Sequence, residues 1–203
     1  MKELLTNIMT DFINCSDCFC SEADFQFNLA WRIKEEIPDA NVILEYPIRI
    51  KEEEKNKYID IYVSHNNKEH FIELKYKTKY EKIERYKQKL ELANQSAQDV
   101  GRYSFCKDIE RLESMKNENS TNYAIFLTND VAYCIDNDNM KSLDTLFRIH
   151  QGKTLNGILN WNTDKKEHWT TNYPPINVKG SYKCDWKGSN SKKYLMLEII
   201  PKF

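Results

Sequence analysis

The first hydrophobic residues of the chain recur at the three- and four-residue spacing of an amphipathic helix. Residues 2–13 place four of them on one stripe, namely Leu5, Ile8, Met9 and Phe12. Such a stripe covers one side of a helix and leaves the other side polar. We therefore expect an N-terminal helix that packs against the core.

A second helix is predicted over residues 22–37. Ser21 is a favourable N-cap, Asp24 stands at the capping-box position, and Pro38 ends the helical pattern. Glu22 lies at the N-terminal end of the stripe that includes the core positions of this helix. Because a carboxylate is unusual on a stripe that packs, we treat Glu22 as a candidate functional residue.

Alternating apolar and polar residues then predict three strands, at residues 42–50, 57–64 and 70–76. The first strand would place five side chains on one face, namely Val42, Leu44, Tyr46, Ile48 and Ile50. Pro47 lacks the N–H that a central strand needs, so we expect this strand at or near an edge of the sheet. The charged segment that follows it predicts an exposed loop.

The pattern becomes looser after the third strand. Thr78 and Glu81 form a second capping-box pattern, which predicts a helix that continues, with a break near Asn94 or Gly101, towards Met115. Further elements are expected as strands at residues 123–128, 131–135 and 194–200 and a short helix at 143–149.

This order of elements predicts an α/β (α+β) fold in which a mixed sheet is flanked by helices. The 203 residues suffice for one core, so we expect a single domain with a core over residues 21–135 and a C-terminal elaboration, with extra β structure, over 136–203. No apolar run is long enough to span a membrane, and the N-terminus lacks the apolar centre of a secretory signal. We therefore expect a cytoplasmic protein without membrane contact.

The second and third strands form a predicted β-hairpin. Asn66 and Asn67 are favourable turn residues, and if they are its two central residues, Asp60 faces Glu73 directly. Like charges at directly opposed positions destabilise a sheet, so this pair needs a nearby cation. Lys75 lies on the same face as Glu73 because side chains alternate along a strand. The opposite face would be wholly apolar, formed by Ile59, Ile61, Val63, Ile72 and Leu74.

The two carboxylates suit a hard divalent cation such as Mg²⁺ or Mn²⁺, which binds oxygen ligands. The expected ligands are Asp60, Glu73 and the backbone carbonyl of Leu74, together with water and a substrate phosphate. Lys75 can then orient or deprotonate an attacking water, or stabilise the charge that develops on the phosphoryl group. With Glu22 in a supporting role, the site predicts metal-dependent hydrolysis of a phosphodiester.

The net charge of −1 argues against a protein that coats nucleic acid, so any such contact must be local. Residues 75–89 are rich in basic side chains, and the candidate contacts are Lys77, Lys79, Lys82, Arg85 and Lys89. Three interleaved tyrosines, Tyr76, Tyr80 and Tyr86, would stack on bases. The alternative is a solvated helix face whose tyrosines are wholly or partly buried.

These residues resemble the PD-(D/E)XK nuclease superfamily over about residues 21–128. Asp60 matches the first acid of the motif, Glu73 and Lys75 match its (D/E)XK half, and Glu22 matches the acid often found on the first helix of the core. The resemblance implies a restriction-endonuclease-like core and a Mg²⁺-dependent nuclease in restriction, repair or anti-phage defence. DNA is the expected substrate, and a homodimer would suit cleavage of both strands of a duplex.

Two departures from the superfamily leave the subfamily unassigned. Ile59 stands where the motif has its nominal proline, and Gln98 and Tyr103 lack the spacing of the glutamine motif found in one branch of the superfamily. Additions such as residues 136–203 commonly determine substrate choice in this superfamily.

Other functions remain open on the residues alone. The hairpin acids and Lys75 can form a structural salt bridge, or the chain can be a catalytically silent module that binds nucleic acid or protein. A third alternative makes the hairpin metal structural and assigns zinc or redox chemistry to Cys15, Cys18 and Cys20. We expect these cysteines to be ordinary thiols, because the second half of a zinc-site pattern is missing.

Overall fold

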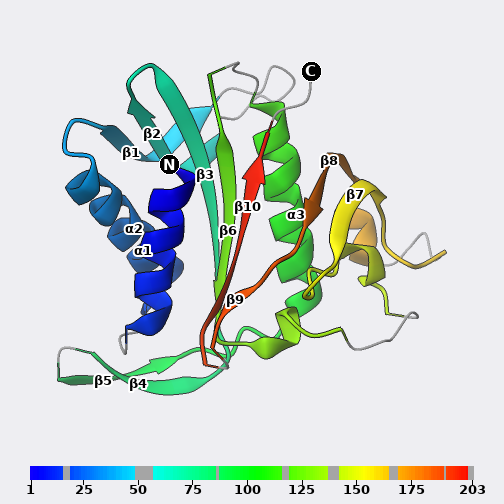
Figure 1. The fold of residues 1–203 in the computed structure, drawn as a ribbon. Helices are drawn as coiled ribbons and strands as arrows, with labels where there is room; N and C mark the ends of the chain where they lie inside the picture. Colours follow the sequence, from blue (N-terminus) through cyan, green and yellow to red (C-terminus); the bar gives the residue numbers. More distant parts are fainter. Residues whose placement is uncertain are drawn as a thin grey trace.

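The computed structural model describes residues 1–15, 19–48, 57–85, 87–115, 119–136, 142–164, 169–189 and 191–200. A central sheet is covered on one face by helices α1 (Lys2–Asn14) and α2 (Glu22–Glu36), and on the other by α3 (Gln98–Ser114) (Figure 1). No helix within the described ranges is long and apolar enough to cross a membrane. The expected mixed α/β class, with helices on both faces of the sheet, is confirmed.

The central sheet is mixed and has the strand order β1-β2-β3-β6-β10-β9. Its strands are β1 (Asn41–Ile48), β2 (Lys57–His65), β3 (Lys68–Lys77), β6 (Asn122–Thr128), β9 (Lys187–Gly188) and β10 (Lys193–Ile199). Strands β3 and β6 are parallel, and the other neighbouring pairs are antiparallel. The long connection from β3 to β6, which contains α3, is what allows these two strands to run in the same direction.

Two hydrophobic clusters hold the layers together, one on each face of the sheet. On the first face, α1 and α2 bury their apolar stripes against Ile61, Val63, Ile72 and Leu74 of the hairpin. On the second face, α3 packs over β6 and β10. Because both faces of β6 are covered, all seven of its side chains are buried, as expected for the continuous apolar run around residues 123–128.

The two N-terminal helices agree with the sequence pattern. Leu5, Ile8 and Met9 are buried on α1, and Phe12 is partly buried beside them. The Ser21 hydroxyl accepts the backbone N–H of Asp24 at 3.1 Å, which is the expected N-cap of α2. The Asp24 carboxylate reaches back to the N–H of Cys20 at 2.9 Å.

Strand β1 is at the sheet edge as expected, but the prediction that its hydrophobic residues share one face is wrong. Glu45 has φ of 50°, which interrupts the alternation of side chains. Val42 therefore packs with the α1–α2 cluster, whereas Tyr46 and Ile48 pack with the α3 cluster. Leu44 is exposed, and residues 49–56, which include Ile50 and most of the charged connection, lie outside the described residues.

The predicted helix from Thr78 to Met115 is wrong in its first half. Residues Glu81–Arg85 and Gln88–Leu92 form the antiparallel strands β4 and β5, in which Ile83 faces Leu90. The Thr78 hydroxyl donates to the carbonyl of Ala93 at 2.7 Å instead of capping a helix. A local β-hairpin therefore forms in place of the predicted helix, and α3 starts only at Gln98.

The C-terminal elaboration contains β structure, but its elements differ in detail from those predicted. The strand predicted at residues 131–135, at the end of the expected core, is wrong: this segment begins with a short 3-10 helix, η1 (Val131–Tyr133), because the Asp130 carboxylate caps the N–H of Ala132. A 3-10 turn, η2 (Thr145–Phe147), occupies the expected helix at 143–149, and η3 spans Trp169–Asn172. Strands β7 (Thr154–Leu159) and β8 (Ile176–Lys183) form a separate sheet, and β8 packs on α3.

Candidate active site

The hairpin β2–β3 has the predicted turn and register. Asn66 and Asn67 are its two central residues and have positive φ values of 49° and 60°. This conformation matches the tight turn whose twist suits two antiparallel strands. Ile61 faces Ile72 as the last regular pair, and Asp60 and Glu73 are the next residues on the two strands.

The regular backbone pairing of β2 with β3 ends at Ile61. Beyond it, the side chain of Asp60 forms the hydrogen bond to β3. Its Oδ2 accepts the backbone N–H of Leu74 at 2.6 Å, and its backbone carbonyl accepts a hydrogen bond from Gln26 of α2 at 2.6 Å. Ile59 packs with the α3 cluster, so the prediction that it shares the apolar face of Ile61 is wrong. The departure of β2 from the regular ladder beyond Ile61 accounts for both features.

Asp60 and Glu73 lie side by side in a poorly solvated place. Glu73 is only 2% exposed, and its carboxyl group is close enough to Asp60 to affect the pKa of Asp60. Burial raises the pKa of Asp60 to about 6, against partial compensation by the N–H of Leu74. Burial raises the pKa of Glu73 as well, and the nearby Asp108 carboxylate adds to the effect. Two carboxyl groups so placed favour sharing a proton over carrying two negative charges.

Helix α3 adds two charged residues that the sequence pattern did not single out. The Lys75 ammonium is 2.9 Å from Asp108 Oδ2, and Arg111 Nε is 2.7 Å from Glu73 Oε1. Arg111 also contacts Asp108 Oδ1 through Nη2 at 2.6 Å. The only signal in the sequence is a pair of opposite charges three residues apart on a helix, which is equally typical of a solvated face.

Lys75 remains a cation in this setting. Burial by itself would lower the pKa of its ammonium group, but the charge and hydrogen bond of Asp108 outweigh burial, and the net shift is upward. Glu22 and Asp60 contribute in the same direction. Lys75 is therefore set up to donate hydrogen bonds or stabilise negative charge more than to accept a proton.

Glu22 reaches the same strand from the other side of the sheet. Its Oε2 accepts the backbone N–H of Tyr76, the residue after Lys75, at 2.6 Å. This bond ties the start of α2 to β3 directly behind the site. The structure thus brings Glu22 next to the Lys75 backbone, in keeping with a supporting role.

The donor set fits a divalent cation, although no group of three or more acidic, histidine or cysteine side chains in the described ranges is arranged as a complete metal cage. Mg²⁺ is commonly held by one or two carboxylates together with water and substrate phosphate. A cation bound between Asp60 and Glu73 would offset the negative charge of their ionised forms. On a strand the N–H and C=O of one residue point the same way, so the carbonyl of Leu74 is directed, like its N–H, towards Asp60.

The basic segment is a β-hairpin instead of a basic helix, and most of its charges are balanced. Lys82 is 3.7 Å from Glu91, Lys89 lies opposite Glu84, and Arg85 is ion-paired with Asp24. The predicted contacts that remain are Lys77, which is half-buried, and Lys79, which is exposed.

The three tyrosines of this segment differ in their surroundings. Tyr76 is buried and donates to the carbonyl of Phe19 at 2.9 Å, whereas Tyr80 is exposed on the approach to β4. Tyr86 lies outside the described residues. Of the two that are described, only Tyr80 presents a ring to solvent.

A hollow of about 600 Å³ opens directly beside Lys75, Asp108 and Arg111. Lys57 from β2 and Lys107 from α3 contribute to its lining, and Tyr173 from the C-terminal elaboration closes one side. A substrate in this hollow would lie against Lys75, Asp108 and Arg111, the residues that contact the acidic pair or lie beside it.

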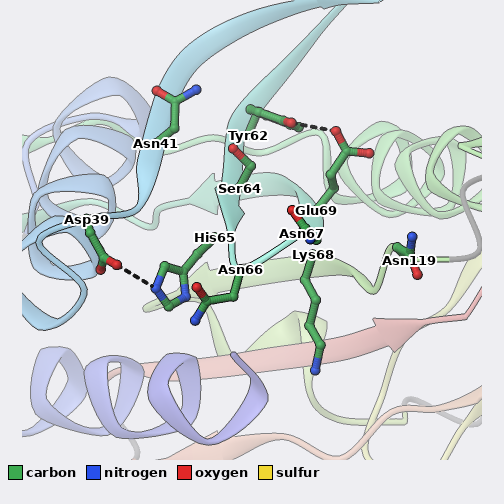
Figure 2. Close-up of a pocket in the computed structure, with 10 residues that line it drawn as sticks. All are labelled: Asp39, Asn41, Tyr62, Ser64, His65, Asn66, Asn67, Lys68, Glu69 and Asn119. Atoms are coloured by element: carbon green, nitrogen blue, oxygen red, sulfur yellow. Dashed lines mark hydrogen bonds and ion pairs between the residues drawn. The ribbon is translucent and has the colours of Figure 1, made fainter.

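A separate hollow of about 710 Å³ lies at the tip of the hairpin (Figure 2). Its acids are already engaged, since Asp39 pairs with His65 at 3.0 Å and Glu69 accepts the hydroxyl of Tyr62 at 2.6 Å. His65 is five residues from Asp60 along β2, which corresponds to roughly 17 Å of extended chain. This hollow is therefore distinct from the acidic site.

The described cysteines are free thiols. Cys15 and Cys20 are exposed, and Cys106, Cys134 and Cys184 are buried, while Cys18 lies outside the described residues. Burial raises the pKa of Cys106 well above its usual range, so this thiol stays protonated.

None of the protein-family models, curated proteins or solved structures compared with the chain matches it.

Proposed function

We propose that this protein hydrolyses phosphodiester bonds of nucleic acid with the help of Mg²⁺ or Mn²⁺. The observation that carries the proposal is the convergence of Asp60, Glu73 and Lys75 on one face of the hairpin, beside an open hollow. The likeness to the PD-(D/E)XK superfamily, and DNA as the substrate, belong to this proposal and rest on the same three residues.

The role of each residue in the proposed reaction follows from its functional group. Asp60, Glu73 and the Leu74 carbonyl would hold the cation, which supplies Lewis-acid activation of water and charge neutralisation when bound. Water attacks phosphorus, the P–O bond to the leaving oxygen breaks, and that oxygen takes up a proton. Because Lys75 is held as a cation by Asp108, its role is to stabilise the charge that develops on the phosphoryl oxygens.

A catalytically silent binding module is the second candidate. It is favoured by the fact that Glu73 and Lys75 already have ion-pair partners on α3 without a substrate. The same pairs are also what a purely structural salt bridge would show. Activity measurements separate these candidates from hydrolysis.

The test compares the wild-type protein with Asp60→Asn and Lys75→Ala on single-stranded, duplex and branched DNA and RNA. Each substrate is incubated with Mg²⁺, Mn²⁺ or EDTA, and Asp39→Asn at the hairpin tip serves as the matched carboxylate control. We expect metal-dependent cleavage by wild type and Asp39→Asn, and a loss of about 100-fold or more in the two site variants. Equal cleavage by all four proteins refutes the proposal, and no cleavage by any favours the binding module.

A further inference from the structure

The hollow beside Lys75 is the middle part of a longer groove that follows α3. A hollow of about 260 Å³ shares Val100 and Ser104 with it and extends to Lys77 and the segment before α3. On the other side, a hollow of about 170 Å³ shares Tyr173 and extends to Trp161 and Pro174. Val100 to Arg111 alone corresponds to about 17 Å of helix.

The charges along this groove suit a polyanion. Among the described residues, four cations line the middle hollow, Lys57, Lys75, Lys107 and Arg111, with two acids, Asp108 and Glu110, and Lys77 lines the adjoining hollow. Both acids are engaged by the protein itself. Asp108 binds Lys75 and Arg111, and Glu110 binds Lys107 at 2.5 Å and the N–H of Asn177 at 2.8 Å.

One wall of the groove is an aromatic platform held in place by its neighbours. The Tyr173 ring lies edge-on to Tyr103, with centroids 5.1 Å apart, and 5.5 Å from Trp169. Its backbone carbonyl accepts the indole N–H of Trp161 at 3.0 Å. Since these contacts fix the ring before any ligand arrives, stacking on it costs little conformational entropy.

We propose that this groove, bounded by Lys77, Lys107 and Tyr173, binds a single unpaired strand of nucleic acid and leads it past Lys75. The inference rests on the proposed function, because it names the form of the substrate for the same site. A row of cations along a backbone path, combined with an aromatic face for stacking, is the usual means of binding single strands. In a duplex the base faces are stacked on one another and cannot reach Tyr173.

The test measures binding in EDTA, where metal-dependent cleavage cannot occur. A labelled 12-nucleotide DNA strand and the corresponding blunt duplex are titrated at low salt by fluorescence anisotropy. The groove variants are Tyr173→Ala and Lys77→Gln, and the controls are Trp31→Ala, an exposed aromatic residue on α2, and Lys68→Gln, an exposed lysine at the tip of the β2–β3 hairpin. Tyr173→Phe, which keeps the ring, shows whether loss of the ring or of the fold is responsible.

We expect the single strand to bind at least tenfold more tightly than the duplex. Tyr173→Ala should weaken binding about fivefold or more, and Lys77→Gln about threefold, while Tyr173→Phe and both controls stay within twofold of wild type. Equal affinity for the duplex, groove variants that match the controls, or no binding at all would each overturn the inference.

Cleavage measured in parallel separates this inference from the proposed function. If wild type cleaves nucleic acid but Tyr173→Ala and Lys77→Gln bind normally, the groove is refuted and hydrolysis stands. If the expected binding pattern occurs without cleavage in any metal, the groove stands and hydrolysis is refuted.

Discussion

At the scale of single residues, the site is a chain of charged side chains in contact with one another. Asp60 lies against Glu73, Arg111 joins Glu73 to Asp108, and Asp108 holds Lys75. Three acids and two bases are confined with little water, which leaves an excess of negative charge. Burial is the main cause of the raised pKa values of Asp60 and Glu73, and it makes their ionised forms a cost to stability at neutral pH.

Asp60→Asn should increase the free energy of unfolding at neutral pH, because it removes one of the buried carboxylates. A carboxyl whose pKa is raised in the folded state stabilises the fold below its unfolded pKa, and this contribution is lost as the pH rises through the folded pKa. For Asp60 the window runs from about 3.8 to about 6, and the expected loss is about 2 to 3 kcal/mol. Urea unfolding in EDTA at several pH values should show Asp60→Asn gaining on wild type across this window, and a constant difference would contradict the assignment.

Arg111→Met should be destabilising, because it leaves Glu73 without its closest cation. We expect the free energy of unfolding to fall by about 2 to 3 kcal/mol, less than for a fully buried pair since Glu73 can take up a proton. Adding Glu73→Gln should restore at least half of the loss. Chemical denaturation of the two single variants and the double variant measures this coupling, and strictly additive effects would show that the two side chains do not interact.

At the scale of elements, the hairpin turn determines where the acids lie. Asn66 and Asn67 both adopt left-handed backbone, which fixes a two-residue loop and therefore the pairing of β2 with β3. A shift of one residue would move Asp60 away from Glu73 and onto the apolar face. The turn at the far end of the hairpin thus determines the positions of Asp60 and Glu73.

Asn67→Gly should stabilise the protein by about 0.5 kcal/mol, since glycine adopts positive φ without steric cost. Asn67→Val should destabilise it by about 1 to 2 kcal/mol, because a β-branched residue resists this conformation. The matched control is Asn41→Gly in the extended strand β1, where glycine should be destabilising. Thermal unfolding measures all three, and a gain in stability for Asn41→Gly as large as for Asn67→Gly would contradict the backbone explanation.

At the scale of the whole molecule, the central strands are covered by neighbouring strands and helices, whereas the β4–β5 hairpin is not. Strand β6 lies between β3 and β10 and is covered on both faces, whereas β4 and β5 pair only with each other (Figure 1). The groove on α3 is lined by residues of the sheet and of α3, and by Tyr173 of the C-terminal elaboration. Stability is therefore expected to be uneven across the fold.

Hydrogen exchange should reveal this difference. We expect amides of β6 to exchange at least 100-fold more slowly than those of β4 and β5, because opening β6 requires loss of both hydrophobic clusters. Mass spectrometry of peptides that cover residues 122–128 and 81–92 gives the comparison. Equal protection of the two regions would mean that the β4–β5 hairpin is an integral part of the core.

The sequence by itself determined α1, α2, the β2–β3 register and the buried strand β6. Each follows from interactions between near neighbours: a helical stripe, the Ser21 cap, the Asn66–Asn67 turn and a short apolar run. The convergence of Asp60, Glu73 and Lys75 on one face followed from that register. Only the tertiary structure decided the rest, including the β4–β5 hairpin, the positive φ of Glu45 and the 3-10 turn at residues 131–133. It also brought Asp108 and Arg111 to the acids and Tyr173 to the groove, because such contacts join residues far apart in the chain, and local pattern does not encode which distant side chains will meet.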